Sequence, residues 1–178
     1  MSDTNFSHAL VVGASSGIGE ALARRLAADG ARVALIARRE DELRRIMDEI
    51  NDAAGEERAI AVAHDVWAAE EAPDLVQEIA RRLGGLDLVI YAAGAMPAVA
   101  IDEYDTAKDR EMLEVNLIGA IAWLNPVAER MARLGRGTIA GIGSVAGDRG
   151  RAPNPVYCTS KAGFHAYLEA LRNRVAKR

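Results

Sequence analysis

The sequence predicts an α/β fold in which a doubly wound parallel sheet carries helices on both faces. Three observations support this prediction. Short apolar runs alternate with longer amphipathic stretches through all 178 residues, in the order expected of repeated βα units. The short runs are continuously apolar instead of alternating with polar residues, as is usual for strands buried on both faces. A glycine-rich turn joins the first run to the first amphipathic stretch, where parallel α/β folds commonly have one.

The first five elements follow one another with short connections. Residues 9–13 (ALVVG) predict a strand, and residues 19–30 have apolar side chains at helical spacing. Residues 31–37 (ARVALIA) predict the second strand. Residues 40–55 predict a helix with acidic and basic side chains paired four residues apart. Residues 58–66 (RAIAVAHDV) predict the third strand.

The second half of the chain repeats this pattern. Residues 73–85 predict a helix with a proline in its first turn, and residues 86–94 (LDLVIYAAG) predict the fourth strand. Residues 106–135 predict one long helix or two. Residues 137–144 (GTIAGIGS) predict a fifth strand, and residues 155–178 predict a final helix.

Pro126 lies within the long predicted helix. Proline lacks the amide that a helix interior requires, so we expect Pro126 to kink this helix or to start a second segment. No internal repeat, low-complexity tract or linker interrupts the sequence. We therefore expect a single domain over residues 1–178.

The composition is that of an ordinary globular protein. Half of the residues are hydrophobic, 27% are charged and the net charge is −4. No basic stripe is present, so nucleic acid is not expected as a partner. Cys158 is the sole cysteine, which excludes a disulfide within the chain and fits a reducing cytoplasm. The start of the sequence does not read as a signal peptide, and no apolar run approaches ~18 residues, so we expect a cytoplasmic protein without a membrane span.

The first turn reads VVGASSGIGE, and Gly13, Gly17 and Gly19 follow the spacing G-x3-G-x-G. Glycines there permit a tight turn and bring a pyrophosphate close to backbone amides, at the positive end of a helix dipole. A plain glycine-rich strand–helix turn is the alternative. The predicted cofactor contacts on this turn are Gly13, Ser15, Ser16, Gly17, Ile18 and Gly19.

The end of the second strand indicates which dinucleotide is bound. A carboxylate there accepts a hydrogen bond from the ribose 2′-hydroxyl of NAD, whereas a cation matches the 2′-phosphate of NADP. Here Ala37 takes that position and is followed by Arg38 and Arg39. This favours NADP(H), with Arg38 as the main contact, and leaves NAD(H) possible. Two solvated arginines at the start of a surface helix are the alternative. Asp65 is expected to accept from the adenine amino group or to act as a local cap.

Three residues near the end of the chain suggest proton chemistry. Tyr157 and Lys161 are four residues apart on a predicted helix and share one face. A tyrosine pKa of about 10 makes a poor base, but a nearby ammonium favours the phenolate. At about 4 Å and an effective dielectric near 20 the attraction is about 4 kcal/mol. At about 1.4 kcal/mol per pKa unit, this is up to about three units. Ser144 ends the fifth predicted strand and is expected to hydrogen-bond the substrate oxygen with which Tyr157 exchanges a proton.

Together these motifs resemble those of the short-chain dehydrogenase/reductase family. The resemblance covers all 178 residues. The matching residues are Gly13, Gly17, Gly19, Asp65, residues 92–94 (AAG), Asn116, Ser144, Tyr157 and Lys161. The resemblance implies a Rossmann-type sheet with strand order 3-2-1-4-5. The later strands that family members have would then be missing from these 178 residues. The resemblance also implies NAD(P)-dependent hydride transfer between an alcohol and a carbonyl of a small molecule.

The resemblance further assigns a role to each residue of the site. It implies that Tyr157 is the acid/base and that Lys161 binds the nicotinamide ribose and lowers the Tyr157 pKa. Ser144 is implied to position the substrate oxygen, and Asn116 to hold a water that extends the proton relay. The implied cofactor contacts beyond the glycine turn are Arg38, Arg39, Asp65, Val66, Ala93, Gly94, Tyr157 and Lys161.

Two positions depart from the family pattern. Val12 replaces the usual threonine before the first glycine, and residues 91–94 read Tyr-Ala-Ala-Gly where the family usually has Asn-Asn-Ala-Gly. The lost side-chain amides put the rigidity of the sheet centre in doubt. Residues 144–163 (SVAGDRGRAPNPVYCTSKAG) are also similar to a bacterial subgroup that includes the decaprenylphosphoryl-ketopentose reductases, which does not fix a substrate.

Family members usually continue well past the equivalent of Arg178. We therefore expect the sequence to lack a C-terminal portion that carries the substrate loop. By resemblance we also expect a homodimer or homotetramer, built on the helices at residues 107–133 and 155–177. The alternatives are a nucleotide-binding short form without turnover, or a keto-sugar reductase or epimerase component. The glycine spacing disfavours an extended-type epimerase.

Overall fold

The computed structural model describes residues 6–176. Within them, five strands form one sheet in which every neighbouring pair is parallel. The strands are β1 (His8–Val12), β2 (Arg32–Ala37), β3 (Ala59–Ala63), β4 (Leu88–Tyr91) and β5 (Thr138–Gly141). Their order is β3-β2-β1-β4-β5, which confirms the predicted Rossmann-type topology.

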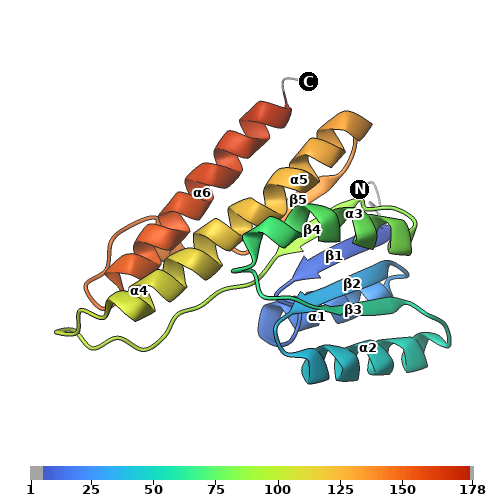
Figure 1. Cartoon of the computed structure of the whole chain (residues 1–178), viewed down its shortest axis with the longest axis horizontal. Helices are drawn as coiled ribbons and strands as arrows, with labels where there is room; N and C mark the ends of the chain where they lie inside the picture. Colours follow the sequence, from blue (N-terminus) through green and yellow to red (C-terminus); the bar gives the residue numbers. More distant parts are fainter. Residues whose placement is uncertain (1–5, 177–178) are drawn as a thin grey trace.

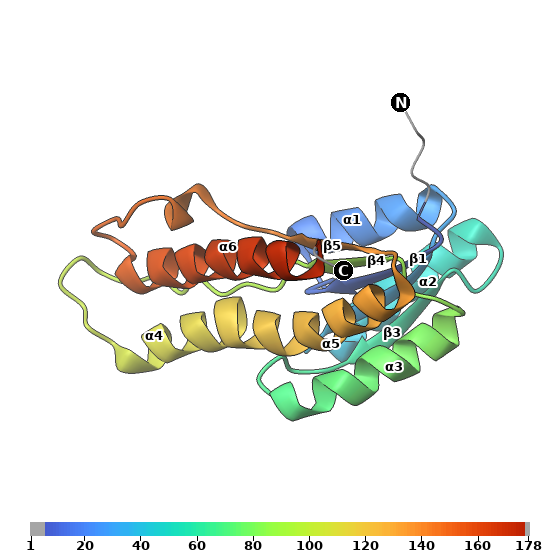
Figure 2. The same cartoon turned by 90° about the horizontal axis from the view of Figure 1, so that it is seen from above.

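Helices cover both faces of this sheet, as Figures 1 and 2 show. One face carries α1 (Gly17–Ala28) and α2 (Glu40–Ala54), and the other carries α3 (Ala72–Leu83), α5 (Gly119–Leu134) and α6 (Pro155–Val175). Alternate residues of each strand point to opposite faces. In β1, for example, Leu10 and Val12 belong to one hydrophobic cluster, and Ala9 and Val11 to the other. The continuous apolar runs are thus strands buried on both sides.

The long predicted helix is divided, but not at Pro126. It consists of α4 (Thr106–Leu113), a π-helical turn η2 (Glu114–Ile118) and α5. The expectation that Pro126 starts a second segment is wrong, because α5 begins at Gly119 and continues through the proline. Fully buried residues on either side of Pro126, such as Trp123 and Val127, anchor α5 on the sheet and outweigh the missing amide.

Short 3₁₀ turns complete the described chain. These are η1 (Ala69–Glu71) before α3 and η3 (Val145–Gly147) between β5 and α6. The final helix was predicted over residues 155–178; α6 ends at Val175, and residues 177–178 lie outside the described part. The pair formed by α4–α5 and α6 runs side by side and extends past the carboxyl ends of the strands (Figures 1 and 2).

The outer edge of β5 borders a hollow of about 790 Å³. Its lining includes Met131 of α5, Ile139 of β5 and Leu171 of α6. In the part of the chain that the structure describes, β5 pairs only with β4. The expectation of a missing C-terminal portion remains a prediction, but the described residues do leave this edge of the sheet uncovered.

Candidate active site

The three glycines of the first turn are required for different reasons. Gly13 has a φ of 93°, and a Cβ there would collide with the backbone of Ala93 after β4. Gly17, the first residue of α1, has a φ of 58°, which side chains rarely adopt. Gly19 packs against the turn so closely that a Cβ would overlap the Gly13 carbonyl. The turn is therefore as tight as the glycine spacing predicted.

The N-terminus of α1 is open toward the space above this turn. Ser16 is the N-cap, but its side chain makes no capping hydrogen bond to the helix. The first amides of α1 thus lack a side-chain partner and carry the positive end of the helix dipole. Such an end binds anions, and phosphate groups in particular.

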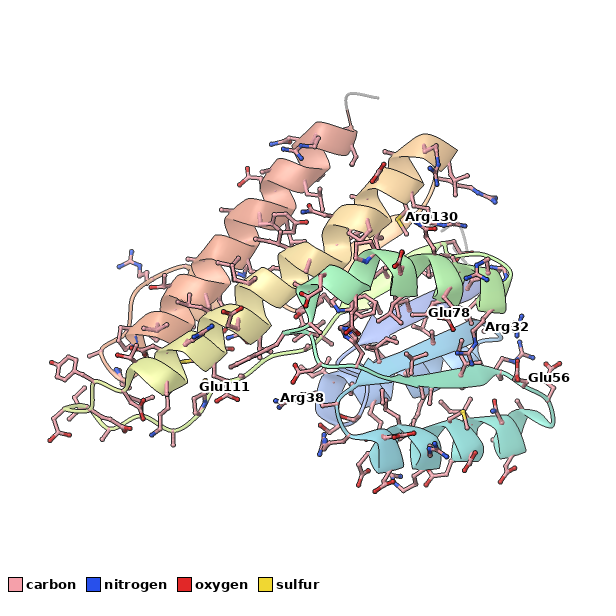
Figure 3. The ribbon with its side chains drawn as sticks, in the orientation of Figure 1. Arg32, Arg38, Glu56, Glu78, Glu111 and Arg130 are labelled. Atoms are coloured by element: carbon pink, nitrogen blue, oxygen red, sulfur yellow. The ribbon has the colours of Figure 1, made fainter. Side chains whose placement is uncertain are left out.

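Arg38 and Arg39 occupy different places beside the turn. The Arg39 guanidinium donates to the Ser15 hydroxyl at 2.9 Å, to the Ser15 carbonyl at 3.2 Å and to the Ser16 hydroxyl at 2.6 Å. Arg38 is 62% exposed, and its Nη1 atom lies 4.0 Å from an Asp65 carboxylate oxygen. Figure 3 shows Arg38 beyond the carboxyl end of β2, whereas Arg32 lies at the amino end of the same strand. Arg39 thus braces the turn, whereas Arg38 is exposed beside Asp65, where a ligand can reach it.

A hollow of about 260 Å³ lies over the carboxyl ends of the central strands. Eight of the predicted cofactor residues line it: Gly13, Ser15, Ser16, Arg38, Arg39, Val66, Ala93 and Gly94. Five further residues complete the lining, and none of them was predicted as a cofactor contact: Ala37, His64, Ala92, Ala95 and Val115. The remaining predicted cofactor residues do not line it: Gly17, Ile18, Gly19, Asp65, Tyr157 and Lys161.

Asp65 lies just past β3, next to this hollow. Its Oδ1 atom accepts a hydrogen bond from the Trp67 amide at 3.1 Å. The local capping role, which the sequence left open, is therefore realised. The other carboxylate oxygen faces Arg38 and remains available for a second contact.

Asn116 lies in the π-helical turn η2 and is fully buried. Its Oδ1 accepts from the Ala95 amide at 2.7 Å, and its Nδ2 donates to the Ala95 carbonyl at 2.9 Å and to the Ser160 hydroxyl at 3.0 Å. Both amide protons are therefore in use. The side chain ties the segment after β4 to α6, a structural contact that the sequence did not reveal.

Lys161 is buried in α6, beside Tyr157. Its Nζ atom donates to the Ile142 carbonyl at 2.9 Å and lies 5.9 Å from the centre of the Tyr157 ring. Burial lowers the pKa of the Lys161 ammonium below its ordinary value. A Cβ placed on Gly94 would lie 3.9 Å from Lys161 Nζ and 3.5 Å from Asn116 Oδ1. Lys161 and Asn116 therefore converge on the segment that borders the hollow.

Ser144 follows β5 and begins the 3₁₀ turn η3. Its Oγ accepts a hydrogen bond from the Ala146 amide at 3.1 Å. Its own amide donates to Nε2 of His165 at 3.2 Å. No functional role was predicted for His165 from the sequence; its position four residues after Lys161 was the available signal.

Tyr91 stands where family members usually have the first of two asparagines, and its side chain makes contacts that an asparagine could not make. Its hydroxyl donates to the Val115 carbonyl at 2.7 Å, and its ring packs on Phe164 at a centroid distance of 5.9 Å. Burial raises the pKa of the Tyr91 hydroxyl, which stays a donor. Tyr91 thus ties β4 to η2, beside Asn116.

Residues 6–176 contain neither a metal site nor a membrane-spanning helix. No group of three or more His, Cys, Asp or Glu side chains is arranged to hold a metal ion in this range. None of its helices is both long and apolar enough to cross a membrane.

Comparison with known proteins assigns the family. The family model for short chain dehydrogenases matches residues 7–178. An uncharacterized oxidoreductase of Staphylococcus epidermidis is 31% identical over 169 residues, which are 95% of this chain and 71% of the relative. The predicted similarity to the ketopentose reductase subgroup remains a prediction.

Solved structures agree with this assignment. A variant of the actinorhodin polyketide ketoreductase with NADPH has a TM-score of 0.87 and 32% identity, over 99% of this chain and 67% of its own. An NAD⁺-bound xylitol dehydrogenase has a TM-score of 0.89 and 28% identity, over 96% of this chain and 65% of its own. The chain spans about two thirds of each of these proteins. It belongs to the short-chain dehydrogenase family of oxidoreductases.

Proposed function

We propose that this protein is an NADP(H)-dependent oxidoreductase that interconverts a small-molecule carbonyl and a secondary alcohol. One observation carries the proposal. Lys161 and Asn116 converge on Gly94, in the lining of the hollow that the glycine turn shares. The Lys161 ammonium, which lies beside the Tyr157 ring, thus adjoins a space suited to a dinucleotide.

The residues around the hollow fit a nicotinamide dinucleotide. The open N-terminus of α1 and the tight turn at Gly13 would hold the pyrophosphate. Val66 in the lining, with Asp65 next to it, would border the adenine. When bound, a reduced nicotinamide supplies a hydride for a carbonyl carbon. Lys161 keeps two ammonium protons free after its bond to the Ile142 carbonyl, and these would hold the nicotinamide ribose.

The preference for NADP(H) rests on Arg38. Ala37 ends β2 without a carboxylate, and Arg38 lies exposed beside it in the lining of the hollow. A guanidinium there would pair with a 2′-phosphate through charge-assisted hydrogen bonds. Structural neighbours include proteins with NADPH and with NAD⁺, so the neighbours alone do not select the cofactor.

The chemistry assigned to the chain is proton transfer and orientation. Tyr157 donates its phenolic proton to the carbonyl oxygen as the oxygen gains negative charge. The Ser144 hydroxyl accepts from the Ala146 amide, so its own proton is free to donate to the same oxygen. The Lys161 ammonium lies beside the Tyr157 ring and stabilises the phenolate that remains. Asn116 holds the segment after β4 against α6 and fixes this arrangement.

A nucleotide-binding protein without turnover is the second candidate. The observation that favours it is the exposed side of the sheet at β5, where Thr138 is exposed and the following residues are only half-buried. Titration of the chain with NADPH, followed by assay of a panel of ketones, separates the two. Saturable binding with ketone-dependent loss of NADPH supports the enzyme; binding without any loss supports the second candidate.

We also propose a homodimer or homotetramer built on residues 107–133 and 155–177. Leu117, Ile121 and Tyr167 remain half-buried along the helix pair, and Ile118 is exposed. Apolar side chains left partly open on an extended helix pair favour self-association. Light scattering of the chain tests this: a mass of two or four chains is expected, and a single-chain mass would contradict it.

A further inference from the structure

His165 lies on the same stripe of α6 as the proposed catalytic pair. It follows Lys161 by four residues and Tyr157 by eight, so all three side chains leave the helix on one side. The imidazole is half-buried and reaches the segment between β5 and η3. It therefore lies between the helix that supplies the tyrosine and the turn that supplies Ser144.

The main chain is shaped around this ring. The Ser144 amide donates to Nε2 at 3.2 Å. A Cβ on Gly143 would lie 2.5 Å from Nε2, and one on Gly147 would lie 2.8 Å from Nδ1. Only glycine leaves room for the imidazole at these two positions. The turn that presents Ser144 is thus fitted to His165 on both sides.

The contact requires a particular protonation state. Nε2 can accept from the Ser144 amide only when it carries no proton, so the ring must be neutral with its proton on Nδ1. A carboxylate oxygen of Asp148 lies 3.8 Å from Nδ1 and favours this tautomer. A second proton would place an N–H against the Ser144 N–H and break the hydrogen bond.

Other charged groups lie near on the same segments. The loop that follows Asp148 carries Arg149 and Arg151, and α6 carries Lys161 one turn before the ring and Glu169 one turn after it. Among the described residues, Asp148 is the one whose charged side chain lies within ion-pair distance of the His165 imidazole. Its attraction and the repulsion of the cations act in opposite directions on a protonated imidazole.

We propose that His165 is a positioning residue that holds Ser144 in place and thereby makes carbonyl reduction sensitive to acid. This inference rests on the proposed role of Ser144. The neutral ring anchors the Ser144 amide while the Ala146 amide anchors its hydroxyl, so that the serine proton is aimed outward. Protonation of the ring releases the amide, and the turn loses one of its two anchors.

The first test is kinetic and uses ketone reduction at saturating NADPH. Imidazoles take up a proton between about pH 8 and pH 5, so kcat of the unmodified protein should fall over that range. His165→Gln offers a neutral amide oxygen to the Ser144 amide; it should keep kcat at pH 8 within about threefold and lose the acid-side fall. His165→Leu offers no acceptor and should lower kcat about three- to tenfold at every pH, with NADPH affinity unchanged.

A matched control is available in His8. It is also half-buried and also lies near a carboxylate, at 3.7 Å from Asp87, but at the amino end of β1. His8→Gln should leave the acid-side fall in place. An acid-side fall that survives in His165→Gln, or that disappears in His8→Gln, overturns the proposal.

The second test needs no turnover. In a ¹H–¹⁵N correlation spectrum, the Ser144 amide should shift with pH in the unmodified protein and stay constant in His165→Gln. A Ser144 amide that does not titrate overturns the inference whatever the kinetics show. A titrating amide in a protein that reduces no ketone supports the contact and contradicts the proposed function instead, so the two failures are distinguishable.

Discussion

The sheet has one closed half and one open half, and the proposed site uses both. Ala9 to Val12 of β1 are fully buried between helices on either side. In β5, by contrast, Thr138 is exposed and the next three residues are half-buried. The glycine turn grows out of the closed half, whereas Ser144 and the start of α6 adjoin the open half.

The two halves fix their functional residues by different means. The glycine turn is held by steric fit, since Gly13 and Gly19 allow no added carbon. The residues proposed for proton transfer are held by hydrogen bonds that involve main-chain atoms, such as that from Lys161 to the Ile142 carbonyl and that from the Ser144 amide to His165. We therefore expect substitutions in the turn to lower stability first, and substitutions near β5 to lower activity first.

The largest expected effect is on the open half, at Tyr157. Tyr157→Phe removes the proposed proton donor and should lower kcat for ketone reduction by about 10²- to 10⁴-fold. The ring remains, so NADPH affinity and the melting temperature should stay unchanged. Steady-state kinetics, NADPH titration and a thermal melt of the one variant check all three. Near-normal turnover would remove Tyr157 from the mechanism.

On the closed half, Gly19→Ala should act on stability. The new methyl group would overlap the Gly13 carbonyl, and we expect a loss of about 3 kcal/mol in the free energy of unfolding. Urea unfolding measures it. Gly150→Ala is the matched control, because open space surrounds Gly150. Equal stability of the two variants would contradict the steric account of the turn.

A smaller effect is expected on cofactor affinity, and it differs between Arg38 and Arg39. Arg38→Ala should weaken NADPH binding about tenfold or more and leave NADH nearly unchanged, since one charge-assisted contact is worth about 1.5–3 kcal/mol. Arg39→Ala should weaken both cofactors alike, because Arg39 braces Ser15 and Ser16. Fluorescence titration of each variant with each cofactor decides it. Equal losses for both cofactors in Arg38→Ala would exclude the 2′-phosphate contact.

The smallest effect concerns the pH dependence of stability at Lys161. Burial lowers its pKa from the ordinary 10.5, so the unfolded chain binds the proton more tightly than the folded chain. The penalty of the buried charge is complete below the lowered pKa and is relieved as pH rises through it toward 10.5. Lys161→Met should therefore be more stable than the unmodified protein at neutral pH, by about 1 kcal/mol.

Urea unfolding of both proteins from neutral to alkaline pH tests this prediction, and the advantage of Lys161→Met should shrink as pH rises. An advantage that grows with pH would mean that the ammonium is stabilised in the fold. Lys161→Met should also lose ketone reduction, as expected of a substitution near β5, which lowers activity before it lowers stability.

The sheet was predictable because burial on both faces requires continuous apolar runs, and β1 to β5 all lie within the predicted segments apart from His8 at the start of β1. The glycine turn was predictable because a tight turn requires glycine at fixed positions, and the spacing G-x3-G-x-G is visible in the sequence. The π-helical turn at Glu114–Ile118 has no such sequence signal, and the proline at position 126 pointed to the wrong place.

The contacts that the sequence did not predict join segments that are distant along the chain. That Asn116 binds Ala95 and Ser160 depends on how β4 and α6 meet, which no local pattern records. The missing asparagines predict a less rigid sheet centre, but Tyr91 supplies a contact of another kind there, a hydrogen bond to the Val115 carbonyl. His165 carried a signal in its spacing from Lys161, but its partner in the Ser144 amide is twenty-one residues away in sequence.

The central claim is that a hydride passes from the bound cofactor to a carbonyl carbon. Its most direct test is to incubate the protein with a ketone and NADPH that carries deuterium at the transferred position, and to examine the product by mass spectrometry. We predict a secondary alcohol with one deuterium on the carbinol carbon for each NADPH oxidised. NADPH that binds and persists, or an alcohol without deuterium, would contradict the account.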